Sequence, residues 1–197
     1  MPSVLSYDLA SPYAYLAVER AAAVLGAEPR LEPVLVGAIF GYRGYGSWAL
    51  TPERAAGEAE IERRAARYGL APVVWPEGWP VNSLQAMRAA TWATSLGAGP
   101  VFAHTAYRRA FGEGADLSDL AVLEDVTAAA GLDPEAMRAA IASDEIKLAL
   151  RRTTEAAWEA GVRGVPTLRI GDRVLFGDDR LEEAAAWRRS TPGARCR

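Results

Sequence analysis

The sequence predicts an α/β fold in which both ends of the chain build one sheet and a long helical segment lies between them. Three observations lead to this prediction. The first 36 residues read as strand, helix and strand, and the chain from residue 165 onward returns to strand, turn, strand and helix. The stretch between them carries mainly helical patterns. Because parallel strands need cover on both faces, we expect the two ends to join, with the inserted helices stacked on one side.

The N-terminal unit opens with an apolar strand over residues 4–9, which holds β-branched and aromatic side chains and no breaker. Ser11 and Pro12 then mark a helix start, because serine is a preferred N-cap and proline suits the first helical position. This helix is expected over residues 13–25, and a second strand over residues 31–36. Such a unit normally gives two parallel strands joined by a right-handed crossover.

The inserted segment is expected to be helical apart from two connections. Residues 37–47 are rich in Gly and aromatic residues, and residues 72–80 are rich in Pro and Trp, so both are predicted as loops. Capping residues such as Asp119 and Asp133 mark helix starts. The expected helices cover residues 51–68, 84–96, 101–111, 117–130, 134–143 and 145–160.

The C-terminal unit combines a proline loop, a hairpin and a helix start. Pro166 opens an apolar run, residues 171–172 turn it into a second run, and residues 177–179 begin the last helix. Together with the first unit, this order is typical of a thioredoxin-like fold. The expected division is a thioredoxin-like domain over residues 1–40 and 161–197, and a helical insertion domain over residues 41–160.

Composition excludes several classes of protein. The chain has 197 residues, a net charge of −3, 50% hydrophobic residues and 24% charged residues, which is ordinary for a globular protein. It has no basic surplus for nucleic acid and no polybasic cluster for a membrane surface. Residues 1–8 lack the pattern of a signal peptide and no apolar run approaches a membrane span, so a cytoplasmic location is expected.

Cysteine and histidine are too scarce for two common kinds of site. Cys196 is the single cysteine, so neither an internal disulfide nor a dithiol redox site can form. His104 is the single histidine, and no cluster of carboxylates accompanies it, so no metal is expected.

The start of the first helix is the expected reactive centre, because a helix N-terminus there stabilises an anion. Ser11 stands where a thioredoxin-like enzyme would carry its attacking cysteine, and Ala14 stands where the resolving cysteine would be. A serine cannot exchange disulfides. Its hydroxyl can, however, donate a hydrogen bond to the thiolate of a bound thiol and so lower the pKa of that thiol.

Each motif also has a purely structural interpretation. Ser11 followed by proline is a routine helix cap, and Val165 with Pro166 can form a simple turn at a strand edge. Asp178 and Asp179 form an ordinary acidic first turn, where carboxylates favour the helix dipole.

Segments 8–17, 82–88, 164–167 and 177–181 together resemble the 2-hydroxychromene-2-carboxylate isomerase family, which is close to kappa-class glutathione transferases within the DsbA-like group. The similarity runs over nearly the whole chain, in the same order and spacing. It implies a DsbA-like fold and glutathione as the cofactor. The implied reaction is addition of the thiolate to a conjugated double bond, rotation, and elimination that regenerates glutathione.

The resemblance also implies roles at the thiol-binding positions. Ser11 would be the catalytic residue and hydrogen-bond the glutathione sulfur. Val165, before a cis Pro166, would pair its backbone with the cysteinyl segment. Asp178 and Asp179 would hold the γ-glutamyl end, with Asp179 meeting its ammonium.

On the substrate side, Asn82 and Arg88 would lie near the cleft, and Tyr13 would form part of its wall. Many relatives carry a lysine or asparagine in the segment matching residues 40–46, where Arg43 supplies the cation here. The expected substrate is an aromatic or unsaturated organic acid, handled by an isomerase or a transferase. Family members are often dimers, so a homodimer is a further expectation. The rival hypothesis is a non-catalytic DsbA-like protein that binds a peptide or another small thiol against the Pro166 loop.

Overall fold

A single mixed sheet unites the two ends of the chain in the computed structural model, which describes residues 3–44 and 46–190. β1 (Ser3–Tyr7) pairs in parallel with β2 (Arg30–Pro33) and antiparallel with β3 (Thr167–Ile170). β3 pairs antiparallel with β4 (Arg173–Phe176), which gives the order β2-β1-β3-β4. The predicted α/β fold, with one sheet built from both ends, is therefore confirmed. Cys196 lies outside the described residues.

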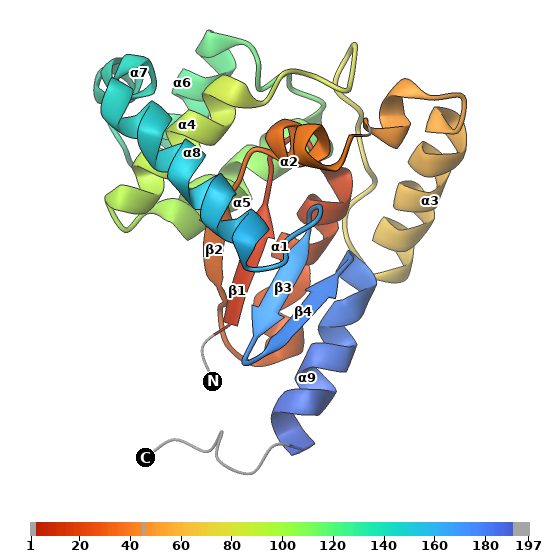
Figure 1. Cartoon of the computed structure of the whole chain (residues 1–197). Helices are drawn as coiled ribbons and strands as arrows, with labels where there is room; N and C mark the ends of the chain where they lie inside the picture. The colour runs from red at the N-terminus through yellow and green to blue at the C-terminus, as the bar shows by residue number, and fades with distance from the viewer. Residues whose placement is uncertain (1–2, 45, 191–197) are drawn as a thin grey trace.

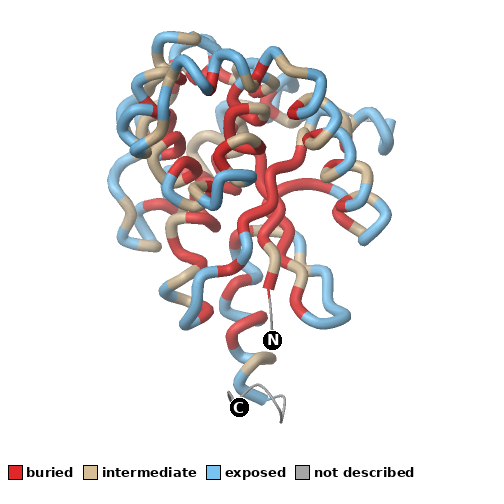
Figure 2. The backbone as a smooth tube through the Cα atoms, turned by 90° about the vertical axis from the view of Figure 1, so that its left-hand side faces the viewer, coloured by how far each residue is buried: buried red, intermediate tan, exposed pale blue. Residues whose placement is uncertain are grey.

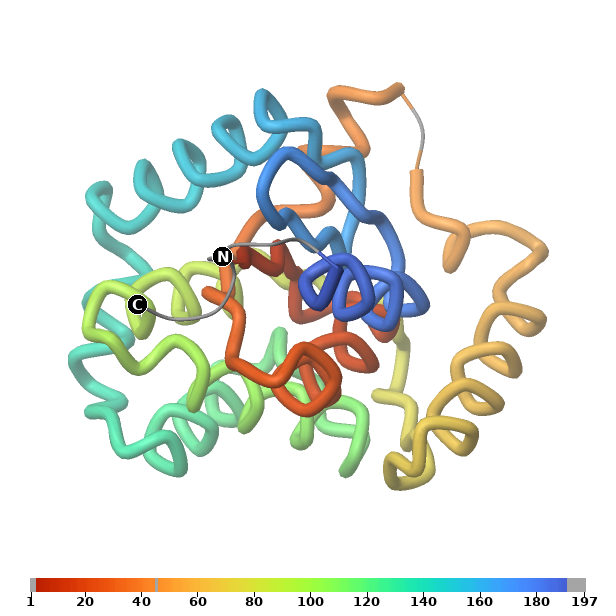
Figure 3. Tube along the Cα trace, turned by 90° about the horizontal axis from the view of Figure 1, so that it is seen from below, coloured from red at the N-terminus to blue at the C-terminus, as the bar shows by residue number. Residues whose placement is uncertain are grey.

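Helices cover both faces of this sheet. α1 (Pro12–Leu25) and α9 (Leu181–Ser190) pack against each other on one face, and α8 (Asp144–Glu159) lies over the other (Figures 1 and 3). The predicted start of α1 is confirmed, because Ser11 is its N-cap and Pro12 its first residue. Buried residues concentrate in strands β1, β2 and β3 and in the helix faces turned toward them, whereas the edge strand β4 is mostly exposed (Figure 2).

The inserted helices do not form one stack, so that part of the prediction is wrong. α3 (Arg54–Arg67) lies on the opposite side of the molecule from the other inserted helices (Figure 1). Only Ile61 and Ala65 of α3 are fully buried, and this narrow apolar face packs against α1 and the short η1 helix (Trp48–Leu50). The remaining helices are α4 (Leu84–Ser95), α5 (Gly99–Tyr107), the π-helix η2 (Arg108–Gly112), α6 (Leu120–Ala129) and α7 (Pro134–Ala142).

The segment predicted as a loop over residues 37–47 is largely a helix, α2 (Val36–Arg43), and the expected domain boundary at residues 40 and 41 falls inside it. Its N-terminus is held by distant side chains, which local sequence cannot reveal. The Val36 amide donates to Asp8 Oδ2 at 2.9 Å, and the Leu35 amide donates to Thr154 Oγ1 at 3.0 Å. Tertiary hydrogen bonds thus override the low helix propensity of its glycines.

Gly41 offers a test of α2. A Cβ added to this glycine meets nothing within 4 Å, so Gly41→Ala should raise the free energy of unfolding by roughly 0.5–1 kcal/mol through reduced backbone entropy of the unfolded chain. Urea denaturation measures this change. The matched control is Gly44→Ala at the helix C-cap, where φ is 74° and an alanine should cost about 1–2 kcal/mol. A destabilised Gly41→Ala variant would argue against the helix.

Across residues 3–44 and 46–190, every helix is either too short or too polar to traverse a lipid bilayer.

Candidate functional site

Strand register brings the segments that carry Ser11, Pro166 and Asp178 to one edge of the sheet. β1 and β2 run in parallel, so both end at this edge. Ser6 of β1 lies opposite Thr167, the first residue of β3, and Thr167 lies opposite Phe176, the last residue of β4. The loop after β1, the proline loop before β3 and the turn after β4 therefore meet there.

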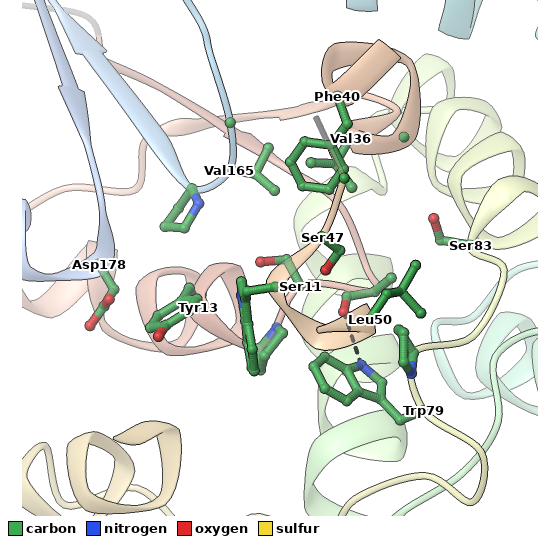
Figure 4. Close-up of a pocket in the computed structure, with 18 of the residues that line it drawn as sticks. Ser11, Tyr13, Val36, Phe40, Ser47, Leu50, Trp79, Ser83, Val165 and Asp178 are labelled. Atoms are coloured by element: carbon green, nitrogen blue, oxygen red, sulfur yellow. Dashed lines mark hydrogen bonds between the residues drawn. The ribbon is translucent and has the colours of Figure 1, made fainter. Parts of the chain in front are cut away.

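A cavity of about 1220 Å³ opens at this edge. In Figure 4, Ser11 lies between an acidic end, where Asp178 is found beyond Tyr13, and an apolar end formed by Phe40, Leu50 and others. The site residues expected from the sequence that line this cavity are Ser11, Tyr13, Asn82, Val165, Pro166, Asp178 and Asp179.

Ser11 is a helix cap that keeps a hydrogen-bond donor available. Its Oγ accepts from the Ala14 amide at 3.2 Å, and its own amide donates to the Asp8 carbonyl at 2.9 Å. Accepting that bond leaves the Ser11 O–H free to donate, and among the described residues we find no acceptor for it. The capping role and a role toward a ligand are therefore compatible.

Asp8 anchors the loop that carries Ser11 and was not identified from the sequence. Its side chain is completely buried, with Oδ1 accepting from the Ala10 amide and Oδ2 from the Val36 amide, both at 2.9 Å. Burial raises the pKa of this carboxyl, while the two backbone hydrogen bonds and one from Ser83 act in the opposite direction. The bond to Ala10, two residues on, is an Asx turn, a signal visible in an Asp that directly follows a strand.

The proline loop forms the wall across the cavity from Ser11 (Figure 4). The peptide bond between Val165 and Pro166 is cis, as the family resemblance implied. The Pro166 carbonyl accepts a hydrogen bond from the Gly177 amide at 3.0 Å. This bond links the proline loop to the turn that carries Asp178 and Asp179.

The acidic end contains an ion-pair network that sequence reasoning missed. Asp178 is 1% exposed, and its Oδ1 accepts from Arg64 Nη1 at 2.8 Å while its Oδ2 accepts from the Tyr68 hydroxyl at 2.9 Å. The Asp178 carbonyl accepts from Arg20 Nη1 at 3.3 Å. Burial raises the pKa of Asp178, and the bonds from Tyr68 and Arg64 oppose that rise. The available signal was the spacing of Arg64 and Tyr68, which places both on one face of a helix.

Aromatic rings dominate the apolar end. Trp48 lies 5.5 Å from Trp79 and 5.9 Å from Tyr13 between ring centroids. Trp79 is fixed by a hydrogen bond from its Nε1 to the Ala10 carbonyl at 3.2 Å, drawn as a dashed line in Figure 4. Further apolar residues at this end are Leu35, Val36, Phe40, Leu50 and Val81.

Of the residues expected on the substrate side, Asn82 lies at the cavity, whereas Arg43 and Arg88 do not. Asn82 lines the cavity and its Oδ1 accepts from the Leu84 amide at 2.9 Å, at the start of α4. Arg43 and Arg88 do not belong to the cavity lining. Arg43 donates to the Arg163 carbonyl at 2.7 Å, and Arg88 donates toward the Ile141 carbonyl of α7 at 3.4 Å. Arg43 thus faces the loop that carries Arg163, and Arg88 faces helix α7.

A metal site finds no support in the described part of the chain, where no group of three or more His, Cys, Asp or Glu side chains converges. His104 instead pairs its Nδ1 with Glu19 at 2.6 Å, and neither residue lines the cavity.

Known proteins with this fold support the family resemblance. The model of the DSBA-like thioredoxin domain matches residues 4–186. A 2-hydroxychromene-2-carboxylate isomerase from Sphingobium xenophagum is 27% identical over 183 residues, which covers 89% of this chain and 92% of that protein. A solved 2-hydroxychromene-2-carboxylate isomerase structure superposes with a TM-score of 0.85 at 24% identity, covering 95% of each chain. The cytosolic disulfide reductase DsbM from Pseudomonas aeruginosa, solved with GSH, gives a TM-score of 0.63 at 20% identity, covering 96% of each chain.

The resemblance expected from the sequence and the thioredoxin-like fold with inserted helices are thereby confirmed. Since the family model spans nearly all of the described chain, this chain belongs to the DSBA-like thioredoxin domain family.

Proposed function

We propose that this protein is a glutathione-dependent isomerase or transferase that acts on aromatic or unsaturated organic substrates. The observation that carries the proposal is that Ser11, with its free O–H, lies between an acidic end and an aromatic end of one cavity. The names of the similar proteins support it, since two are 2-hydroxychromene-2-carboxylate isomerases and one was solved with GSH.

The donor set fits a thiol tripeptide. Ser11 offers a hydroxyl at the N-terminus of α1, where the helix dipole also favours a negative sulfur. The Val165 backbone lies on the facing wall, and Asp179 offers an exposed carboxylate to a ligand's ammonium. When bound, glutathione supplies a thiolate nucleophile that adds to a conjugated double bond and leaves again after rotation.

The protein's own residues then have three tasks. Ser11 donates a hydrogen bond that keeps the sulfur deprotonated. The acidic end and the proline loop orient the tripeptide. The aromatic end, with Trp48 and Trp79, excludes water and offers flat surfaces to a planar substrate. A single cysteine at position 196 leaves no dithiol for disulfide exchange, so the sulfur must come with the ligand.

Titration with glutathione tests the proposal. At neutral pH we expect saturable binding by calorimetry together with the ultraviolet difference absorbance of a thiolate. S-methylglutathione is the control ligand, which should bind without the thiolate band. Binding without a thiolate would favour the non-catalytic alternative, and tighter binding of another small thiol would identify a different ligand. If no glutathione binds, the proposal is wrong.

A further inference from the structure

Arg64 extends from the inserted helix α3 to the acidic end of the cavity. Its Nε donates to Glu60 at 2.7 Å, its Nη1 donates to Asp178 at 2.8 Å, and its guanidinium carbon lies 5.5 Å from the Tyr13 ring centroid. Three neighbours therefore fix the guanidinium in one orientation. Partial burial acts to lower the pKa of Arg64, but the hydrogen bond with Glu60 and the charge of Asp178 outweigh it and raise that pKa, so the side chain stays charged.

Asp178 acts as the internal counter-ion of Arg64. Both of its carboxylate oxygens accept hydrogen bonds from within the protein, and its side chain is only 1% exposed. It therefore has no free oxygen turned to the cavity for a ligand. Its neighbour Asp179 differs, since its side chain is 54% exposed and lies 3.9 Å from Arg64 Nη1.

Arg64 retains a donor for a ligand. Its side chain is 26% exposed, and among the described residues none forms a hydrogen bond with its Nη2. The acidic end thus presents a guanidinium edge beside an exposed carboxylate. A simple cation placed there would leave the free donor of Arg64 without a partner, and a simple anion would leave the exposed carboxylate of Asp179 without one. A group that carries a carboxylate and an ammonium on one carbon satisfies the two partners together.

The resemblance already implies that Asp179 meets the α-ammonium of the γ-glutamyl end of the thiol ligand, and we propose that Arg64 binds the α-carboxylate of that same end. In this arrangement Asp178 and Tyr68 are positioning residues that hold Arg64. The inference rests on the proposed function, and it deepens it: the site selects thiols that end in a free α-amino acid.

Ligand analogues separate the two charges. In one tripeptide the γ-glutamyl group is replaced by 4-aminobutyryl, which lacks the α-carboxylate, and in another by glutaryl, which lacks the ammonium. Calorimetry compares the dissociation constants of both analogues and glutathione for the wild type and for Arg64→Gln and Asp179→Asn. The matched control is Arg63→Gln, which removes a neighbouring cation of α3 that also pairs with Glu60 but is 66% exposed and does not line the cavity.

The wild type should bind glutathione about 10- to 100-fold more tightly than either analogue, the range expected for one hydrogen-bonded charge. Arg64→Gln should abolish the preference over the 4-aminobutyryl analogue and keep the preference over the glutaryl analogue. Asp179→Asn should do the reverse, and Arg63→Gln should change neither. Thermal unfolding of each variant checks that it is folded, and Arg64→Lys, which keeps the charge without the planar fork, should retain part of the preference.

Two results would overturn the inference while glutathione still binds. One is an equal loss of affinity for all three ligands in Arg64→Gln, which would make Arg64 a structural residue. The other is loss of the carboxylate preference in Arg180→Gln, which would assign the role to the other arginine of this end. Absence of glutathione binding by the wild type would instead reject the proposed function together with this inference.

Discussion

Replacement of Ser11 by alanine should raise the pKa of the bound glutathione thiol by about one to two pH units. It should also lower turnover at neutral pH about 10- to 100-fold. The reason is the loss of one hydrogen bond to a charged acceptor, which is worth about 1.5–3 kcal/mol. The thiolate absorbance of the complex, followed as a function of pH, measures the pKa directly. Steady-state assays with an aromatic electrophile measure the turnover.

The same substitution also removes a helix cap, so its structural effect must be separated from its chemical one. Ser143→Ala is the matched control, because Ser143 caps α8 in the same way, accepting from the Ile146 amide at 3.3 Å, and it does not line the cavity. Both variants should lose about 1 kcal/mol of unfolding free energy, but only Ser11→Ala should lose activity. Full activity of Ser11→Ala with an unchanged thiol pKa would reduce Ser11 to a cap.

Removal of the Asp8 carboxylate should be the most destabilising change near the site. Asp8→Ala leaves the partly buried amides of Ala10 and Val36 without their acceptor, at an expected cost of about 2–4 kcal/mol. Asp8→Asn keeps one acceptor oxygen and turns an NH₂ group toward the other amide, so we expect about 1–3 kcal/mol. Urea denaturation at constant pH gives both values.

The pH dependence of this effect has a definite sign. Because burial raises the folded-state pKa of Asp8 above the ordinary 3.8, its contribution to stability is complete below that value and is lost as the pH rises through the folded-state pKa. Asparagine does not titrate. The stability advantage of the wild type over Asp8→Asn should therefore be largest below pH 3.8 and shrink as the pH rises through the folded-state pKa of Asp8, after which it becomes constant. An advantage that grows with pH would contradict the burial argument.

Asp133→Ala provides the comparison for an exposed carboxylate with the same local geometry. Asp133 accepts from the Glu135 amide two residues on at 2.9 Å, on the surface of the molecule. Its loss should cost only about 1 kcal/mol, because water replaces the hydrogen bond. A cost as large as that of Asp8→Ala would show that burial is not the cause.

Local sequence was sufficient for the elements that depend on neighbouring residues. The start of α1 at Ser11 and Pro12, its end at Gly26 and the hairpin before Gly177 follow from caps and turns within a few positions. The segments of the site were therefore recognised individually. The expectation that the two ends of the chain share one sheet also predicted that these segments meet at one edge of that sheet.

The failures share a different cause. Helix α2 is fixed by hydrogen bonds from its first turn to Asp8 and Thr154, which are remote in sequence. Arg64 reaches Asp178 across 114 residues, and no local pattern states which face of α3 turns toward the cavity. The same holds for Arg88: the sequence predicted its helix but not the direction in which its side chain points.

By itself, the sequence determined the fold class, the joining of the two ends of the chain in one sheet and the replacement of the reactive cysteine by Ser11. Only the tertiary structure decided that Asp178 is an internal counter-ion of Arg64 and that Asp179 is exposed beside it. The physical reason is that capping and turn formation act within a few residues. Whether a charged group is free or already paired depends on the distant side chains packed against it.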